Sequence, residues 1–275
     1  MPLRIAIVTD IHHGAPSNTK RGDAALPLLA RFVDAVAQDK PDLVLEMGDR
    51  ISDVDRDSDL TLQKEVAAAL AGLDTPIHHI CGNHDRDHLS VAENEEILGQ
   101  ALAHEIVDLG DWQIALWRAD AKIARGPEYR GFTLPEADLL WLSRMAQAAE
   151  KPTLVVSHVP VSGHSQVGNY YFQRSPQFAT YPEAERAREA LAQARAPMLC
   201  LAGHVHWNTV TQIDGIPHLT LQSLTESFTT QGHPAAAWGM LTLTDTAHWQ
   251  VFGRDPFEAR VTPQAGRWTP PLAPF

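Results

Sequence analysis

The sequence has little cysteine and no long hydrophobic run. Its two cysteines, Cys81 and Cys200, are far apart and form no CxxC pair, so they provide no disulfide framework and fit a reducing compartment. No apolar stretch reaches the length of a membrane-spanning helix. The N-terminus shows neither the apolar core nor the small-residue cleavage site of a signal peptide. We therefore expect a cytoplasmic protein.

Positive charge is also scarce. The chain has 22 Lys and Arg against 34 Asp and Glu, a net charge of -12 with histidine neutral, and no run of basic residues. An acidic chain of this kind binds nucleic acid and anionic membranes poorly without specific sites. We expect neither a long nucleic acid nor a membrane as its partner. It also lacks a glycine-rich nucleotide loop, so any phosphate group must be bound by other means.

Short apolar runs alternate with helical patterns through most of the 275 residues, of which 44 % are hydrophobic. The apolar runs predict strands at 3–9, 43–47, 77–80, 153–157 and 198–201. Apolar residues at helical spacing predict helices at 23–38, 60–70, 135–149 and 182–194, with Pro135 at the first helical position. Strands separated by helices indicate crossover connections and a mainly parallel sheet.

The last third of the chain changes character. Two pairs of β-type runs, one around Asp214–Gly215 and one around Thr244–Thr246, predict antiparallel hairpins. Residues 159–181 lack a clear element, and an irregular segment of that length is usually functional, so we interpret it as a substrate-facing loop. Residues 254–275 form a Pro-rich C-terminal tail. With no repeat and no linker, residues 1–275 are predicted to form a single domain.

Side chains that can bind metal follow five of the predicted strands. They are Asp10 and His12, Asp49, Asn83 to Asp85, His158, and His204 with His206. In open α/β sheets the carboxyl ends of the strands share one edge, where sites form. Each motif alone is weak, because Asp-x-His, Gly-Asp and a lone histidine are common in solvated turns. Five such motifs in order, each at a strand end, favour a metal site over coincidence.

This series of motifs resembles the calcineurin-like metallophosphoesterases over about residues 4–210. In pattern the chain is also similar to two groups within that superfamily, the bacterial class III cyclic-nucleotide phosphodiesterases and the ADP-ribose/CDP-alcohol diphosphatases. The resemblance implies an α/β fold, a four-layer αββα sandwich of two mixed sheets flanked by helices. It also implies two divalent metal ions at the strand ends.

The resemblance further implies how the ions are held. Asp10, His12, Asp49 and His206 would bind the first ion, and Asp49, Asn83, His158 and His204 the second. Carboxylate, imidazole and amide ligands suit Mn, Fe, Zn or Mg, and paired ions can hold a bridging hydroxide for in-line attack on a phosphoryl group. His84 would contact the phosphate and assist the leaving group. Asp85, next in sequence, is predicted to orient the His84 imidazole.

One position departs from the family pattern. Many relatives have an acidic residue three positions after the bridging aspartate. Here Ser52 stands at that position, and Asp53 follows it. The departure leaves the predicted metal ligands intact, but it leaves open which groups support them from behind.

The substrate is predicted less directly. Accessory candidates are His13, Arg50, Arg86, His164 and Arg174, although for each of them taken singly an ordinary surface side chain is the favoured interpretation. Tyr170 lies among aromatic residues beside Arg174, in the segment after His158. Such rings could stack a nucleobase, or they could form a hydrophobic lid or an oligomer contact. We count Asn83, His164, Tyr170 and Arg174 as candidate substrate-binding residues.

We expect an enzyme that hydrolyses a small phosphodiester, with a cyclic or other nucleotide preferred. The alternatives are a pyrophosphatase acting on ADP-ribose or CDP-alcohol substrates, and a broad phosphomonoesterase. A metal-free scaffold is not favoured, because every predicted metal ligand and His84 are present. A homodimer formed through the tail at 268–275 is possible.

Overall fold

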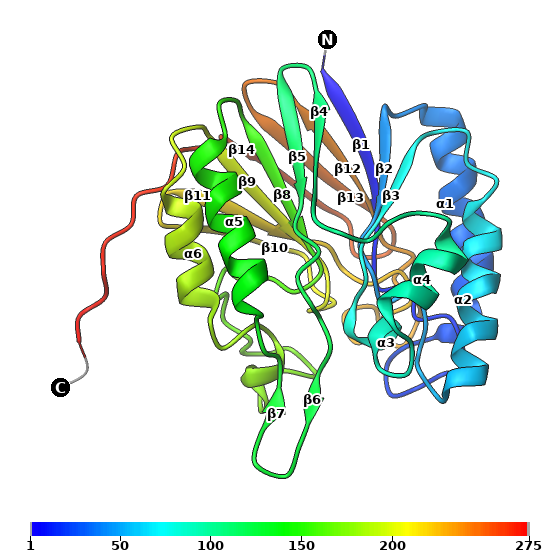
Figure 1. Ribbon diagram of the computed structural model, residues 1–275. Helices are drawn as coiled ribbons and strands as arrows, with labels where there is room; N and C mark the ends of the chain where they lie inside the picture. The colour runs from blue at the N-terminus through cyan, green and yellow to red at the C-terminus, as the bar shows by residue number, and fades with distance from the viewer. Residues whose placement is uncertain (1, 274–275) are drawn as a thin grey trace.

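The computed structural model describes residues 2–273, which form two six-stranded sheets packed face to face (Figure 1). The first sheet has the order β14-β13-β12-β1-β2-β3 and the second β10-β11-β9-β8-β5-β4. The strands of the first are Leu3–Val8 (β1), Leu43–Glu46 (β2), Ile77–His79 (β3), Trp238–Leu243 (β12), Ala247–Phe252 (β13) and Phe257–Val261 (β14). Those of the second are Glu105–Leu109 (β4), Trp112–Leu116 (β5), Thr153–Ser157 (β8), Met198–Ala202 (β9), Thr209–Ile213 (β10) and Ile216–Thr220 (β11).

Both sheets are mixed. In the first, β1 pairs in parallel with β2 and antiparallel with β12. In the second, β8 pairs in parallel with both β5 and β9, while β10 and β11 form the antiparallel hairpin expected around Asp214–Gly215. The strands at the centre of each sheet are buried on both faces, as in β8, where all five residues are buried. Continuous apolar runs form such strands because neither face meets water.

Helices cover the outer face of each sheet. The first sheet is covered by Ala25–Asp39 (α1) and Arg56–Leu70 (α2), and the second by Glu136–Ala148 (α5) and Ala184–Ala192 (α6) (Figure 1). Three apolar clusters fill the three interfaces of this stack. One lies between the first sheet and its helices, one between the sheets, and one between the second sheet and α5 and α6. The predicted four-layer αββα architecture is confirmed.

The element boundaries differ from the predicted ones for identifiable reasons. The predicted helix at 60–70 begins earlier, at Arg56, because the Asp55 carboxylate accepts a hydrogen bond from the Ser58 amide at 2.9 Å and caps it. Pro135 is the N-cap of α5 and not its first helical residue. The hairpin of β4 and β5 and the helix Val91–Leu98 (α4) were not predicted. Strand β4 is a partly exposed edge strand, so its sequence carries a weak apolar signal.

The C-terminal segment is only partly a tail. Residues 257–261, predicted to be extended tail, form β14 at the edge of the first sheet, where they pair with β13. Beyond it, Gln264 pairs with Met198, and the chain then runs away from the body of the protein (Figure 1). Residues 274 and 275 of the predicted dimer segment lie outside the described residues. Residues 159–181 contain only turns and the short 3-10 helix Pro176–Phe178 (η2). No helix within residues 2–273 is long and apolar enough to span a membrane.

Candidate metal centre

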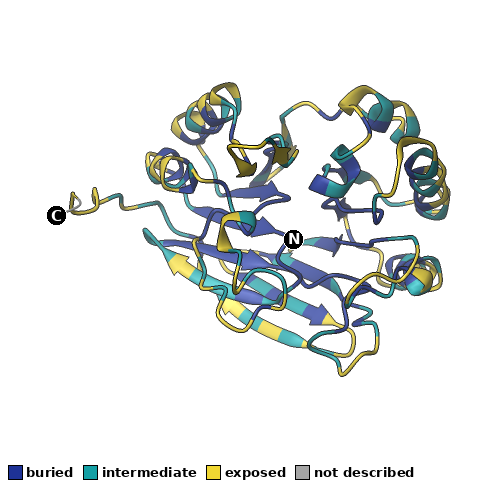
Figure 2. Ribbon diagram, turned by 90° about the horizontal axis from the view of Figure 1, so that it is seen from below, coloured by how far each residue is buried: buried dark blue, intermediate teal, exposed yellow. Residues whose placement is uncertain are grey.

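The carboxyl ends of strands from both sheets meet at one edge of the molecule. Strands β1, β2 and β3 of the first sheet and β8 and β9 of the second each precede one of the predicted motifs. Figure 2 looks onto this edge, where the buried strand ends are surrounded by loops. The five strands therefore belong to two sheets and not to one. The packing of the sheets brings their ends together.

Two groups of acidic and imidazole side chains lie at this edge. Asp10, His12, Asp49 and His206 form the first, and Asp49, His158 and His204 form the second, with the candidate ligand atoms of each group within 4.8 Å of one another. All six residues are buried. Asp49 belongs to both groups, which is the arrangement that a carboxylate bridging two ions requires.

The hydrogen bonds of the histidines fix which ring nitrogen faces the cluster. His158 Nδ1 donates to the Met47 carbonyl at 2.8 Å, and His204 Nε2 donates to the Phe178 carbonyl at 2.7 Å. The opposite nitrogens, His158 Nε2 and His204 Nδ1, are buried without a hydrogen-bond partner among residues 2–273. Asp10 Oδ1 and Asn83 Oδ1 are unpartnered in the same way. Buried polar atoms without a partner are costly, and divalent cations would satisfy these four, so the residues present fit a dinuclear site.

Backbone strain is concentrated at the same positions. Ten non-glycine residues of the described chain have positive φ, and five of them are predicted metal ligands: Asp10, His12, Asp49, His204 and His206. This left-handed conformation is uncommon outside glycine and persists where the surrounding structure enforces it. Close approach adds a second constraint, since a Cβ at Gly82 would collide with the Asp49 carboxylate and one at Gly203 with Asp10. The loops are held so that the ligands converge.

The buried charges shift the ionisation of the cluster. Burial lowers the pKa of His12 well below its usual value and that of His204 to about 4. For His158 and His206 burial acts in the same direction, but it is outweighed. The Asp49 carboxylate raises the pKa of His158 to about 9, and Asp10 and Glu226 raise that of His206 to about 9. Without metal these two imidazoles hold protons near neutral pH, and a bound cation must displace them.

The aspartate that contacts His84 is not the predicted one. His84 Nδ1 is hydrogen-bonded to the Asp53 carboxylate. Asp85 accepts instead from the main-chain amides of Asp49 at 2.8 Å, Arg50 at 3.0 Å and Gly82 at 2.8 Å. The orienting role predicted for Asp85 is therefore wrong. The turn of helix Asn83–Arg86 (α3) directs its carboxylate back to the strand-end loops. Asp53, four residues after Asp49, supplies the acid missing at Ser52.

Beneath Asp49 lies a buried ionic network, which we call the floor; it consists of Glu46, Arg50, Gln63, Asp85 and Asn94. The Arg50 guanidinium is fully buried and contacts Glu46 Oε2 at 2.6 Å, Gln63 Oε1 at 2.7 Å and Asn94 Oδ1 at 3.0 Å. It lies 3.2 Å from Asp85 Oδ2. Arg50, an accessory candidate, thus lies behind the site. Both carboxylates of the floor contact the one guanidinium of Arg50, and the two amide side chains add hydrogen bonds that hold it in place.

Aromatic side chains pack against two histidines of the cluster, His204 and His206. Tyr171, Phe172 and, from a later loop, Phe228 line it together with Tyr170, and we call these four residues the wall. The ring centroids of Tyr171 and His206 lie 5.4 Å apart, and those of Phe172 and His204 5.1 Å apart. Tyr170 is 55 % exposed and is stacked on Phe228. The segment 159–181 therefore packs directly on the metal-site histidines.

Of the other predicted substrate-binding residues, His164 lies elsewhere, Arg174 faces solvent and Asn83 lies at the cluster. His164 Nδ1 is hydrogen-bonded to Thr211 Oγ1 at 2.7 Å, and the residue lines a separate pocket with Thr209 and Thr220. Arg174 is exposed. Asn83 stands at the start of α3, with the unpartnered Oδ1 described above.

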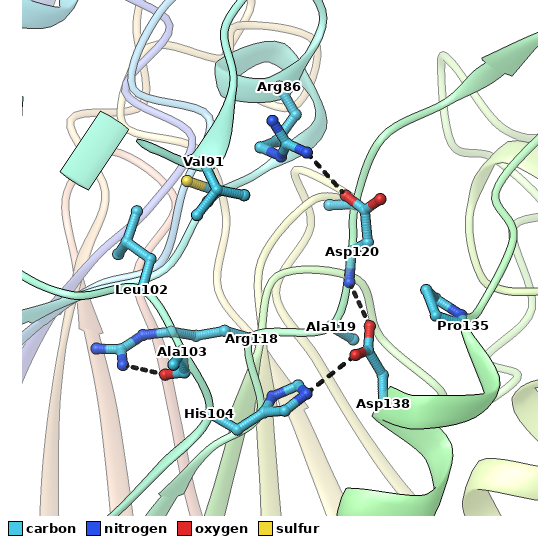
Figure 3. A pocket seen from close by; sticks show the side chains of 12 residues that line it. Arg86, Val91, Leu102, Ala103, His104, Arg118, Ala119, Asp120, Pro135 and Asp138 are labelled. Atoms are coloured by element: carbon cyan, nitrogen blue, oxygen red, sulfur yellow. Dashed lines mark hydrogen bonds and ion pairs between the residues drawn. The ribbon is translucent and has the colours of Figure 1, made fainter. Parts of the chain in front are cut away.

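The two remaining accessory candidates are also engaged away from the cluster. His13 Nε2 is paired with Glu65 at 2.6 Å. Arg86 faces another pocket, where it lies 3.6 Å from Asp120 (Figure 3).

Two charged residues at the site were not predicted. Glu226 accepts a hydrogen bond from His206 Nδ1 at 2.8 Å and so orients that ring. The Lys20 side chain is buried, with Nζ 3.5 Å from His84 Nε2. Both residues come from irregular loops, where a lone charged residue gives no periodic signal. For Glu226, the only hint was its place in a polar segment next to the predicted hairpins.

Comparison with known proteins agrees with this geometry. Residues 3–208 match the family model described as calcineurin-like phosphoesterase. No curated protein matches the sequence. The solved structure of a dimetal phosphatase from Danio rerio aligns with a TM-score of 0.74 at 17 % identity, covering 96 % of this chain and 100 % of that one.

Two further solved structures share the fold. A purple acid phosphatase from yellow lupin (Lupinus luteus) seeds aligns with a TM-score of 0.65 at 12 % identity, covering 95 % of this chain and 54 % of that one. A phosphopantetheinyl hydrolase from Mycobacterium tuberculosis aligns with a TM-score of 0.52 at 13 % identity, covering 82 % and 92 %. At these identities the likeness concerns the fold. The family match spans most of the chain, and the protein therefore belongs to the calcineurin-like phosphoesterase family.

Proposed function

We propose that this protein is a dinuclear-metal phosphoesterase that hydrolyses a small phosphodiester, preferably a nucleotide. The observation that carries the proposal is the sharing of Asp49 between the two groups of buried ligand atoms. Divalent ions bound there would polarise the phosphoryl oxygens and lower the pKa of a coordinated water. Asp10, His12, Asp49 and His206 would hold one ion, and Asp49, Asn83, His158 and His204 the other. The acidic surface of the chain argues against a long nucleic acid as substrate.

His84 is the chain's own candidate for proton transfer. Its side chain is 26 % exposed, whereas that of Asp49 is 2 % exposed, and its Nδ1 is bonded to Asp53. An acceptor at Nδ1 keeps a proton on that nitrogen and leaves Nε2 facing the open side, where a substrate oxygen would lie. The pair thus holds the ring so that Nε2 can assist departure of the leaving oxygen of a bound substrate.

The wall supports an organic group of limited size and flat shape. Tyr171 and Phe172 rest on the ligand histidines, and Tyr170 presents an exposed ring beside them. A nucleoside could stack on such a surface, where base stacking on an aromatic side chain contributes roughly 1–3 kcal/mol. This surface supports a nucleotide over a simple alkyl ester.

The test is metal analysis followed by a substrate screen. Protein loaded with Mn, Fe, Zn or Mg is assayed with bis(p-nitrophenyl) phosphate and p-nitrophenyl phosphate. The second panel contains 2',3'- and 3',5'-cyclic nucleotides, ADP-ribose, CDP-alcohols and glycerophosphodiesters. We expect two ions per chain and the highest kcat/KM on a nucleotide diester. Preference for ADP-ribose or CDP-alcohols would make the enzyme a pyrophosphatase, and preference for monoesters a phosphomonoesterase. No turnover of any ester by the metal-loaded protein would leave a scaffold role.

A further inference from the structure

The loop that carries Lys20 is anchored on both sides of the site. Within the loop, Ser17 and Lys20 exchange main-chain hydrogen bonds of 3.0 and 2.9 Å. The Thr19 hydroxyl is bonded to the Tyr171 hydroxyl at 2.9 Å, and the Arg21 amide donates to the Thr225 carbonyl at 3.0 Å. The wall and the loop that bears Glu226 therefore fix the backbone on either side of Lys20, so its side chain has a defined direction.

The ammonium of Lys20 points into the site and is poorly paired. The residue is 6 % exposed, and its Nζ has one hydrogen-bond partner within residues 2–273, His84 Nε2 at 3.5 Å. It forms no ion pair with any carboxylate of the described chain. Buried lysines are rare unless paired, because the charge has lost its water. The geometry leaves an ammonium and an imidazole that face the same space with no anion between them.

The charges around Lys20 indicate which kind of anion could lie between its ammonium and His84. Asp10, Asp49, Asp53 and Glu226 act on Lys20 at longer range. Together they carry four negative charges, and two divalent ions would neutralise them. The ammonium would then lie in a buried site without a carboxylate at ion-pair distance among residues 2–273. A phosphoryl group bound to the ions brings negative oxygens to this place, and low local dielectric strengthens such a pair.

We propose that Lys20 is a substrate-binding residue whose ammonium pairs with an anionic oxygen of the phosphoryl group, beside His84. The inference rests on the proposed function, since it requires that the site binds phosphate. Lys20 would then be a positively charged side chain next to the bound phosphoryl group. The metal-binding motifs supply no lysine or arginine at that place. The alternative is a lysine that only balances the acidic cluster and touches no ligand.

The experiment measures binding of inorganic phosphate by isothermal titration calorimetry to the metal-loaded protein at fixed ionic strength. We compare the wild type with K20M, K20R and the control K64M, which alters an exposed lysine on α2. Metal content and melting temperature are recorded for each. We expect K20M to keep two ions and to raise the Kd for phosphate about tenfold or more, as for the loss of a charge-assisted bond. K20R should recover part of the affinity, and K64M should match the wild type.

Equal phosphate affinity in K20M and wild type, with equal metal content, would overturn the proposal, as would a wild type that does not bind phosphate. If K20M does not fold, the proposal is tested instead by measuring the rate of lysine acetylation in the wild type with and without phosphate. Phosphate should slow modification of Lys20 but not of Lys64, and an unchanged rate at Lys20 would overturn the assignment. If the wild type hydrolyses an ester but its phosphate affinity does not depend on Lys20, only this inference is overturned. If phosphate binding depends on Lys20 but no ester is hydrolysed, only the proposed function is overturned.

Discussion

The floor and the wall enclose the same cluster by different means. The floor joins its members by ion pairs and hydrogen bonds, such as the 2.6 Å contact of Arg50 Nη1 with Glu46 Oε2. The wall is made of rings, and Tyr171 and Phe172 meet the ligand histidines edge-on or tilted. Asp85 in the floor accepts a hydrogen bond from the main-chain amide of Asp49, whereas the wall packs against the imidazole rings of His204 and His206. The floor therefore fixes where the ions bind, and the wall shapes what reaches them.

Among the substitutions that test these roles of the floor and the wall, we expect the largest effect on metal content and turnover at Asp49, whose main-chain amide is bonded to the floor. Asp49→Asn should remove bound metal from both positions and abolish detectable turnover, because one carboxylate serves both groups. Metal analysis by mass spectrometry after desalting measures the loss. Asp57→Asn, on a side chain 94 % exposed, is the control. A variant that retained two tightly bound ions would contradict the bridging role.

His84 belongs to neither the floor nor the wall, and its substitution should separate metal binding from catalysis. His84→Ala should keep both ions and lower kcat roughly 10²–10⁴-fold, the usual contribution of a general acid. Rates with bis(p-nitrophenyl) phosphate, together with metal content, make the comparison. The exposed His233→Ala is the matched control. A rate within twofold of the wild type would remove His84 from the reaction.

Arg50 tests whether the floor supports the metal site. Arg50→Met leaves Glu46 and Asp85 buried without their cation, and breaking a buried ion pair costs about 3–5 kcal/mol of unfolding free energy. We expect a large drop in denaturation midpoint and weaker metal retention. Arg31→Met, at an exposed position on α1, should leave both unchanged. Normal stability and metal content in Arg50→Met would show that the floor does not position Asp49.

Removal of metal should make stability depend on pH in a defined direction. In the metal-free protein the pKa values of His158 and His206 are raised to about 9, from an ordinary 6.5. The stability gained from their protonated forms is full below pH 6.5 and is lost as pH rises through 9. The melting temperature of EDTA-treated protein should therefore fall between pH 6.5 and 9. Loaded protein should bind its ions more tightly over the same range. A flat or rising profile after EDTA would contradict the raised values.

The smallest effect is expected at the wall. Tyr170→Ala removes an exposed ring that no metal ligand contacts among the described aromatic pairs. KM for a nucleotide substrate should rise up to about tenfold, as for loss of one stacked base, while kcat and metal content stay the same. Leu140→Ala, on an exposed face of α5, is the control. An equal rise in KM for a substrate without a base would show that the ring is a lid.

The same division explains what could be predicted from the sequence. Asp10, Asp49 and His158 follow apolar strands directly, so periodicity together with residue type located them. The choice between Asp53 and Asp85 as the partner of His84 depended on the direction of a single helical turn, which spacing does not determine. Arg50 looked like a surface residue because its neighbours in the floor come from four separate segments. Lys20 had no periodic signal at all, since its position is set by contacts with loops near Tyr171 and Thr225.

The pairing of β1 has a consequence for biosynthesis. Leu3 pairs with Leu243, so β1 lies in the middle of its sheet beside a strand that is made much later in translation. Until those later residues leave the ribosome, one edge of β1 lacks its neighbour and exposes unpaired main-chain groups. Long-range pairing of this kind slows folding and prolongs exposure to aggregation. The nascent chain already carries Asp10 and His12 at the end of β1 while that sheet is still incomplete.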